Sequence, residues 1–170
     1  MPLLSPVILL MSLVMSPVLT GDTLMVVDKS SHELVLYKHG EQIFKADVAT
    51  GKSEELTPEG LFDVKVKAIE PYYRKKDIPG GDPKNPLGSR WIGFDAKETD
   101  GRTYGVHGTN NPSSIGKAVS AGCIRMSNSE VEKLYTLVEE DSEIIITKNS
   151  PNYEQIYEEW ERTKWEKYLK

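Results

Sequence analysis

One cysteine in the chain is placed where it could act as a nucleophile. Cys123 is the only cysteine among 170 residues and lies in the segment SAGCIRM (120–126). A free thiol with an ordinary pKa of about 8–9 is at most a few per cent thiolate at neutral pH. A nucleophilic cysteine therefore needs a base within hydrogen-bond reach. A lone cysteine can also be a small buried hydrophobe, so its neighbours must decide between the two interpretations.

Three histidines are available as that base. His32 and His39 occupy polar turns between expected strands, where solvation is the simplest expectation. His107 ends an expected strand, and the loop 109–119 leads from it back towards the cysteine. We therefore expect His107 and Cys123 at the same end of adjacent segments.

The residues that flank this pair favour catalysis over packing. Gly108 and Gly122 would let the backbone approach a substrate closely, and N–H groups beside the thiol could bind an oxyanion. Arg125 could hold a carboxylate with two parallel hydrogen bonds. In this setting we expect the Cys123 thiol to be accessible and to have a depressed pKa.

The elements that must position these groups are mostly strands. Runs rich in β-branched and aromatic residues predict an antiparallel meander of three strands at 23–28, 33–38 and 41–50. The same pattern predicts further strands at 61–66, 90–96, 102–108 and 142–148. Asp100-Gly101 is a turn signal, so the strands on either side of it should form a second hairpin.

Residues 71–89 form a long segment rich in proline and glycine, with no hydrophobic period. A loop of this length inside a compact domain is usually functional, for example as a lid over a site. A mobile connector is the alternative interpretation.

Two helices are expected near the end of the chain. Ser127 and Glu130 have the capping-box spacing, and apolar residues at 131, 134, 135 and 138 predict a short amphipathic helix after them. A terminal helix should follow Pro151, with one face formed by Tyr153, Ile156, Tyr157, Trp160 and Lys164. We expect this face to pack on the domain; a partner-binding helix is the alternative.

The first charged residue of the chain is Asp22, and everything before it is uncharged and largely apolar. Residues 1–21 therefore predict a cleaved export signal or a membrane anchor, with an N-terminal core element as a further alternative. A lipid-modified cysteine is excluded here, because Cys123 is the only one. Exported proteins use cysteines mostly in pairs, so the single thiol is conspicuous. The net charge of −5 argues against a nucleic-acid partner.

The sequence resembles a known family, the catalytic domain of the L,D-transpeptidases (YkuD type). The resemblance rests on YGVHGT (104–109) and SAGCIRM (120–126), supported by TPEGLF (57–62) and NPLGSRWIGF (85–94). The family often has Ser-His-Gly-Cys where this chain has Ala121 in place of the second histidine. The resemblance implies a mostly β fold, a β-sandwich or mixed sheet, over residues 22–148. Residues 149–170 would be a helical extension.

The resemblance also implies roles for individual residues. Cys123 would be the nucleophile, His107 its base, and the backbone carbonyl of Gly108 would orient the imidazole through its other nitrogen. Further residues would bind the substrate: Tyr104, Ser120, Gly122 and Arg125. No metal or cofactor is implied, because the thiol and the imidazole supply both nucleophile and acid/base.

The implied activity is acyl transfer on peptidoglycan stem peptides outside the cytoplasm. The thiolate would attack the carbonyl that joins the diamino acid at stem position three to the D-alanine at position four. An amine of another stem would then accept the acyl group, giving a 3→3 cross-link. Carbapenem-type β-lactams would be inhibitors. The alternatives are an L,D-carboxypeptidase with water as acceptor, a protein-anchoring transpeptidase, or a wall-binding module without catalysis.

Overall fold

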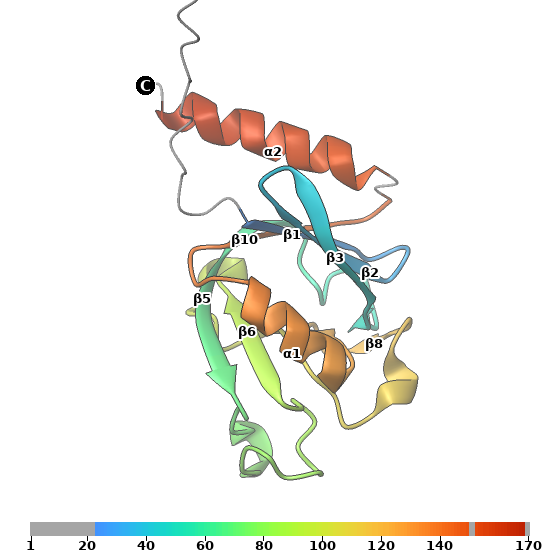
Figure 1. Cartoon of the computed structure of the whole chain (residues 1–170). Helices are drawn as coiled ribbons and strands as arrows, with labels where there is room; N and C mark the ends of the chain where they lie inside the picture. Colours follow the sequence, from blue (N-terminus) through green and yellow to red (C-terminus); the bar gives the residue numbers. More distant parts are fainter. Residues whose placement is uncertain (1–22, 150–151, 169–170) are drawn as a thin grey trace, which may run out of the picture.

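The structure is a computed structural model that describes residues 23–149 and 152–168 (Figure 1). The expected export signal or anchor at residues 1–21 lies outside the described residues. Within the described ranges, no helix combines the length and the apolar character that crossing a membrane requires.

The first three strands form the predicted antiparallel meander. They are β1 (Thr23–Asp28), β2 (Glu33–Lys38) and β3 (Glu41–Asp47), each joined to the next by a short turn. His32 and His39 lie in these turns with positive φ angles of 56° and 51°. The ring of His32 is also within 3.3 Å of the Thr50 hydroxyl, so it is not simply solvated.

Across the described residues, eight strands form one mixed sheet in the order β3-β2-β1-β10-β5-β6-β7-β9. The later strands are β5 (Gly60–Ile69), β6 (Arg90–Phe94), β7 (Tyr104–His107), β9 (Ile124–Arg125) and β10 (Glu143–Thr147). β10 pairs in parallel with β1 and antiparallel with β5, so it joins the two halves of the sheet. The predicted hairpin between β6 and β7 is present. The mostly β fold is therefore confirmed.

Several short elements complete the connections. β4 (Thr50–Gly51) and β8 (Ala118–Ser120) form a small parallel pair beside the main sheet. Single 3-10 turns lie at η1 (Arg74–Lys76), η2 (Ala96–Glu98) and η3 (Pro112–Ser114).

Helix α1 (Asn128–Leu137) begins where the capping box predicts. The N–H of Glu130 donates to the Ser127 hydroxyl at 3.3 Å, and that hydroxyl donates to the Glu130 carboxylate at 2.9 Å. Val131 and Leu134 are fully buried against the sheet, and α1 contacts β6 and β7 (Figure 1). The predicted amphipathic helix is confirmed.

Helix α2 (Tyr153–Tyr168) covers the opposite face of the sheet. β1 is buried on both faces: Met25 packs into the main core with α1, whereas Leu24 packs into a second cluster with Tyr157 and Trp160 of α2. The Trp160 indole donates to the Glu143 carboxylate at 2.8 Å. The predicted packing of this helix on the domain is confirmed (Figure 1).

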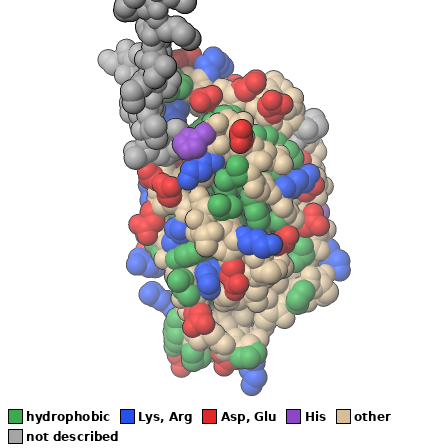
Figure 2. All heavy atoms as spheres, in the orientation of Figure 1, with side chains coloured by type: hydrophobic (Ala, Val, Ile, Leu, Met, Phe, Trp, Pro, Cys, Tyr) green, Lys and Arg blue, Asp and Glu red, His purple; other side chains and the backbone are tan. Residues whose placement is uncertain are grey.

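Acidic and basic side chains are interspersed over the face drawn in Figure 2. Mixed signs of this kind are typical of an ordinary solvated protein surface. The net charge of −5 is therefore not gathered into one patch on this face.

Candidate active site

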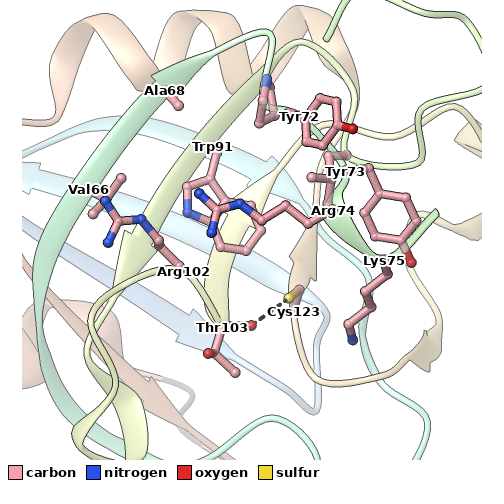
Figure 3. Close-up of a pocket in the computed structure, with 12 residues that line it drawn as sticks. Val66, Ala68, Tyr72, Tyr73, Arg74, Lys75, Trp91, Arg102, Thr103 and Cys123 are labelled. Carbon is pink, nitrogen blue, oxygen red and sulfur yellow. Dashed lines mark hydrogen bonds between the residues drawn. The ribbon is translucent and has the colours of Figure 1, made fainter. Parts of the chain in front are cut away.

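A cavity of about 350 Å³ opens beside the thiol of Cys123 (Figure 3). Its volume lies within the range of small-molecule and peptide sites, roughly 300–1,000 Å³. The walls come from β5, the long loop 71–89, β6 and the segment before β7. They combine apolar, aromatic and cationic side chains: Val66, Ala68, Pro71, Tyr72, Tyr73, Arg74, Lys75, Leu87, Trp91, Arg102 and Thr103.

A tight turn presents Cys123 to this cavity. Gly122 has φ of +132°, and a Cβ there would lie 2.6 Å from the carbonyl oxygen of Leu56, so the position requires glycine. The Ser120 hydroxyl accepts from the Gly122 N–H at 3.0 Å and donates to the Cys123 carbonyl at 2.6 Å. The buried Thr57 hydroxyl donates to the Gly122 carbonyl at 3.0 Å.

This turn corrects part of the site expected from sequence. Ser120 and Gly122 shape the backbone around Cys123, and neither lines the cavity. Because the Gly122 N–H already donates to Ser120, it is not free to bind an oxyanion. Substrate contact by these two residues stays a prediction.

The register of β7 and β9 brings His107 and Cys123 together. The two strands are parallel, with Val106 opposite Ile124 and His107 opposite Arg125. Val106 and Ile124 are fully buried in the main core. Because side chains alternate along a strand, His107 and Cys123 both face away from that core. Adjacent segments therefore carry the two groups on one face, but not at the same end as expected: His107 ends β7, whereas Cys123 precedes the start of the parallel strand β9.

The imidazole of His107 is oriented by the backbone that follows it. Its Nδ1 lies 2.6 Å from the carbonyl oxygen of Gly108. A carbonyl oxygen can only accept, so Nδ1 carries the proton and Nε2 keeps its lone pair. This is the arrangement that the resemblance implies for a base, with Gly108 as the third member.

The thiol is not hydrogen-bonded to that imidazole in this structure. Its Sγ donates to the carbonyl oxygen of Thr103 at 3.5 Å, and no hydrogen bond joins Sγ to His107 among the described residues. Hydrogen bonds between catalytic groups are often long before the substrate binds.

Trp91 covers the histidine and forms a wall of the cavity. The indole and the His107 ring are stacked, with centroids 5.5 Å apart. A Cβ at Gly105 would lie 2.7 Å from the indole ring, so glycine is needed beneath it. His107 itself is 4% exposed and does not line the cavity. Trp91 belongs to a segment that carried the family resemblance, yet nothing in the sequence marks it as a site residue.

Burial keeps the histidine neutral. It lowers the pKa of His107 from 6.5 to about 4, and the positive charge of Arg125 adds to this effect. Hydrogen bonds with the backbone of Gly108 and Leu87 raise the pKa of His107, but by less than burial lowers it. At neutral pH the imidazole is therefore unprotonated, although the same burial weakens it as a base.

Burial also raises the pKa of the Cys123 thiol above its ordinary value of 9.0. A hydrogen bond with the backbone of Gly105 and the charges of Lys75 and Arg125 oppose this rise but do not reverse it. The expected depressed pKa is therefore wrong, because desolvation outweighs the nearby cations. At neutral pH both groups are therefore uncharged, as a thiol and a neutral imidazole.

Asn128 joins the long loop to the segment that orients the histidine. Its Oδ1 accepts from the backbone N–H groups of Ser89 and Thr109, both at 3.2 Å. A Cβ at Gly88 or Gly108 would lie 2.2 or 2.1 Å from this same oxygen. The first residue of α1 thus holds two glycine-containing segments together, and one of them carries the carbonyl that contacts His107.

The loop 71–89 is an ordered wall of the cavity. The buried Asn85 amide donates to the carbonyls of Pro71 at 2.8 Å and Pro79 at 3.0 Å. The Glu70 N–H donates to the Ser89 carbonyl at 2.9 Å and closes the base of the loop. Since residues 71–75 line the cavity, the structure favours the functional interpretation of this loop over a mobile connector.

Two further residues expected at the site do not line the cavity. Tyr104 packs with the main core, and its ring centroid lies 6.4 Å from that of Phe94. Arg125 exchanges backbone hydrogen bonds with Ala49, at 2.8 and 2.9 Å. Its charge nevertheless acts on both His107 and Cys123. Direct substrate contact by either residue stays a prediction.

The chain matches a described family and several relatives. The L,D-transpeptidase catalytic domain (YkuD) matches residues 22–146. The chain is 52% identical over 138 residues to the L,D-transpeptidase homologue YqjB of Bacillus subtilis, covering 81% of this chain and 78% of YqjB. It is 38% identical over 101 residues to the homologue YkuD of the same organism, covering 59% of this chain and 51% of YkuD. The chain thus spans about half the length of the latter.

Solved structures share the fold. An L,D-transpeptidase from Mycobacterium smegmatis is 26% identical, with a TM-score of 0.58 over 74% of this chain and 58% of that chain. L,D-transpeptidase 3 from Mycobacterium tuberculosis, in complex with a faropenem-derived adduct, is 20% identical, with a TM-score of 0.59 over 74% of this chain and 60% of that chain.

Proposed function

Because the chain belongs to the L,D-transpeptidase family, with a YkuD-type catalytic domain, we propose that it transfers peptidoglycan stem peptides through a thioester on Cys123. One observation carries this proposal. The only thiol of the chain opens onto a cavity and shares a sheet face with a neutral histidine whose Nδ1 is held by the Gly108 carbonyl.

The first half of the reaction forms the acyl-enzyme. His107 Nε2 takes the thiol proton as sulfur attacks the carbonyl between the diamino acid at position three and the D-alanine at position four. The carbon–sulfur bond forms, the carbon–nitrogen bond breaks, and the imidazolium returns the proton to the departing amine. D-Alanine leaves, and the donor stem remains bound as a thioester.

The second half transfers the stem to an acceptor. The side-chain amine of another stem attacks the thioester, the carbon–sulfur bond breaks, and the proton lost by the amine returns to the sulfur through His107. The product is a 3→3 cross-link. With water as the acceptor the same acyl-enzyme would give an L,D-carboxypeptidase.

β-Lactams provide a second substrate class for the same thiol. One structural relative, L,D-transpeptidase 3 from Mycobacterium tuberculosis, holds an adduct derived from the β-lactam faropenem. We infer that carbapenem-type β-lactams acylate Cys123 by opening of the lactam ring, because ring opening needs the same nucleophile and base.

The proposed substrate also implies a location. Peptidoglycan stem peptides lie outside the cytoplasm, so the protein would act in the extracytoplasmic wall, with residues 1–21 directing export or anchoring. Fractionation of cells that express the full chain tests this: recovery of the protein only from the cytoplasm would contradict it.

The activity test uses the purified protein, disaccharide-tetrapeptides as donor, and mass spectrometry of the products. We expect 3→3 cross-linked dimers and released D-alanine, whereas Cys123→Ala should give neither while keeping the wild-type circular dichroism spectrum. A carbapenem should add one drug mass to the peptide that contains Cys123. Cross-linking by a folded Cys123→Ala protein would refute the thioester mechanism. Tripeptides without dimers would identify water as the acceptor.

A further inference from the structure

The cavity beside Cys123 is cationic, although the chain as a whole carries a net charge of −5. Three of its lining residues are Arg74, Lys75 and Arg102, and none of the lining residues is acidic. Figure 3 shows that Arg74 extends over Trp91 and that Lys75 extends along the side of the cavity that holds Cys123. Positive charge is therefore placed beside the nucleophile.

Within the part of the chain that the structure describes, two of these three cations have no carboxylate partner of their own. Arg102 forms an ion pair with Asp100 at 2.9 Å, which offsets its charge. Among the residues that the structure describes, no ion pair joins Arg74 or Lys75 to an Asp or Glu. Asp77 follows on the same turn, but it accepts a hydrogen bond from the Tyr72 hydroxyl. Arg74 and Lys75 are thus available to a bound anion.

The position of these cations is fixed by the loop that carries them. Arg74 and Lys75 form the 3-10 turn η1, and the bridge between Tyr73 and Ile78 closes that turn at 2.9 and 3.2 Å. The charge of Lys75 also reaches the sulfur, since it lowers the pKa of Cys123 against the effect of burial. A cation that acts on the nucleophile also acts on any charge within a few atoms of the carbonyl under attack.

We propose that Arg74 and Lys75 form a carboxylate-binding subsite that selects acyl donors with a free carboxylate on the leaving D-amino acid. This rests on the proposed function and adds to it the chemical feature by which the donor is recognised. That carboxylate is separated from the scissile carbonyl by only the amide nitrogen and one carbon. An amidated or esterified terminal residue would be neutral at that place and would lose the attraction.

A pair of alkylating reagents measures the subsite without any peptide donor. The same thiolate attacks the iodine-bearing carbon of iodoacetate and of iodoacetamide and displaces iodide, and the two reagents differ by one negative charge. The ratio of their rates at Cys123 therefore reports the local potential, and any change in the thiol pKa cancels. We expect this ratio to fall by about three- to tenfold for each charge removed in Arg74→Gln and Lys75→Gln, and less at high salt.

Lys76 provides the matched control. It belongs to the same turn and carries the same charge, but it does not line the cavity. Lys76→Gln should keep the wild-type ratio of iodoacetate to iodoacetamide rates. Equal ratios in the wild type, Arg74→Gln and Lys75→Gln would overturn the proposal, as would a Lys76→Gln effect as large as theirs.

Three tetrapeptide donors then identify the carboxylate that is bound. All three carry a diamino acid that has a side-chain carboxylate. The first has this carboxylate and the C-terminal one free, the second has a C-terminal carboxamide, and the third has the carboxylate of the diamino acid amidated. Acylation of Cys123 is followed by intact-protein mass. We expect the second donor to react about tenfold or more slowly than the first with the wild-type protein. Arg74→Gln/Lys75→Gln should remove this difference.

The outcomes separate this inference from the function on which it rests. If no donor acylates a wild-type protein that iodoacetamide alkylates at Cys123, the proposed function fails. If the first and second donors react equally, the function stands and the subsite proposal is overturned. Slow reaction of the third donor alone would also overturn the assignment to the leaving residue and place the bound carboxylate on the diamino acid.

Discussion

The imidazole of His107 lies against the indole of Trp91, with planes only 17° from parallel. The indole is fixed in turn, because its N–H donates to the Gly101 carbonyl at 2.8 Å. One side chain thus covers the base from solvent and forms a wall of the substrate cavity. The neutral state of the base and the shape of the cavity therefore depend on the same residue.

Replacing Trp91 with leucine should raise the pKa of His107 from about 4 towards 6.5, because a smaller side chain lets water reach the ring. NMR titration of the His107 ring resonances, assigned with a His107→Gln variant, measures this change. Trp165→Leu changes an exposed tryptophan on α2 and should leave the titration unchanged. An unaltered His107 titration in Trp91→Leu would show that other residues keep the ring dry.

His107 should make stability depend on pH between about 4 and 6.5. Its pKa is lower in the folded state, so the unfolded chain binds more protons in this window. Stability then rises with pH, is fully present above 6.5 and is lost towards 4. A shift of this size corresponds to about 3 kcal/mol.

Urea unfolding of the wild type and His107→Gln between pH 4 and 7.5 measures this contribution. Other groups titrate equally in both proteins and cancel in the difference between the two free energies of unfolding. Between pH 4 and 6.5 that difference should change by about 3 kcal/mol, because the wild type gains stability relative to His107→Gln as the pH rises. Parallel curves would mean that the folded and unfolded pKa values of His107 are similar.

The Cys123 thiol should ionise above its ordinary pKa of 9.0, because it is buried. Iodoacetamide alkylation followed against pH should therefore have its midpoint above this value. His107→Gln should slow donor acylation by about 10²- to 10⁴-fold, as loss of a positioned base does, without lowering that midpoint. A wild-type midpoint well below 9.0 that rises in His107→Gln would reveal a preformed thiolate–imidazolium pair.

Asn128→Ala should slow acylation of Cys123 by about tenfold or more and cost about 1–3 kcal/mol, because two backbone N–H groups lose their acceptor. Asn128→Asp keeps an oxygen at this position and should retain most activity. Alanine is a better helix former than aspartate. If the substitutions acted only through the stability of α1, Asn128→Ala would therefore keep more activity than Asn128→Asp. Ser129→Ala, in the same turn of α1, is the control. Equal activity of the Ala and Asp variants would argue against positioning by this acceptor.

Trp160→Ala should destabilise the protein by about 3–5 kcal/mol, because it empties a buried site and removes the donor to Glu143. Trp165→Ala changes the same residue type on the exposed side of α2 and should cost about 0.5 kcal/mol or less. Denaturant unfolding of both variants gives the comparison. Similar small losses would show that α2 contributes little to the stability of the sheet.

Features that depend on neighbouring residues could be predicted from the sequence. The start of α1 is an example, because Ser127 and Glu130 satisfy each other within one turn. The meander is another, since each strand pairs with the next along the chain. The pairing of His107 with Gly108 also involves consecutive residues, and the family resemblance implied it.

Features that depend on tertiary packing could not be predicted. Arg74, Lys75 and Trp91 line the same cavity as Cys123 only because the sheet places β6 one strand away from β9, with β7 between them, and the long loop lies over that region. The thiol pKa was predicted in the wrong direction for the same reason. The glycine and arginine neighbours of Cys123 can be read from the sequence. The burial of the thiol cannot, and its effect on the pKa is larger than that of the nearby charges.

The parallel pairing of β1 with β10 has a consequence for how the chain folds. It joins residues 23–28 to residues 143–147, so contacts at the middle of the sheet have a very high sequence separation. Until β10 is available, β1 and β5 each have an unpaired edge that can recruit strands from other molecules. Closing so large a loop costs conformational entropy before the stabilising strand contacts can form. We therefore expect slow folding, with a late and cooperative assembly of the sheet. We therefore expect the incomplete chain to be most prone to aggregation before β10 has been synthesised.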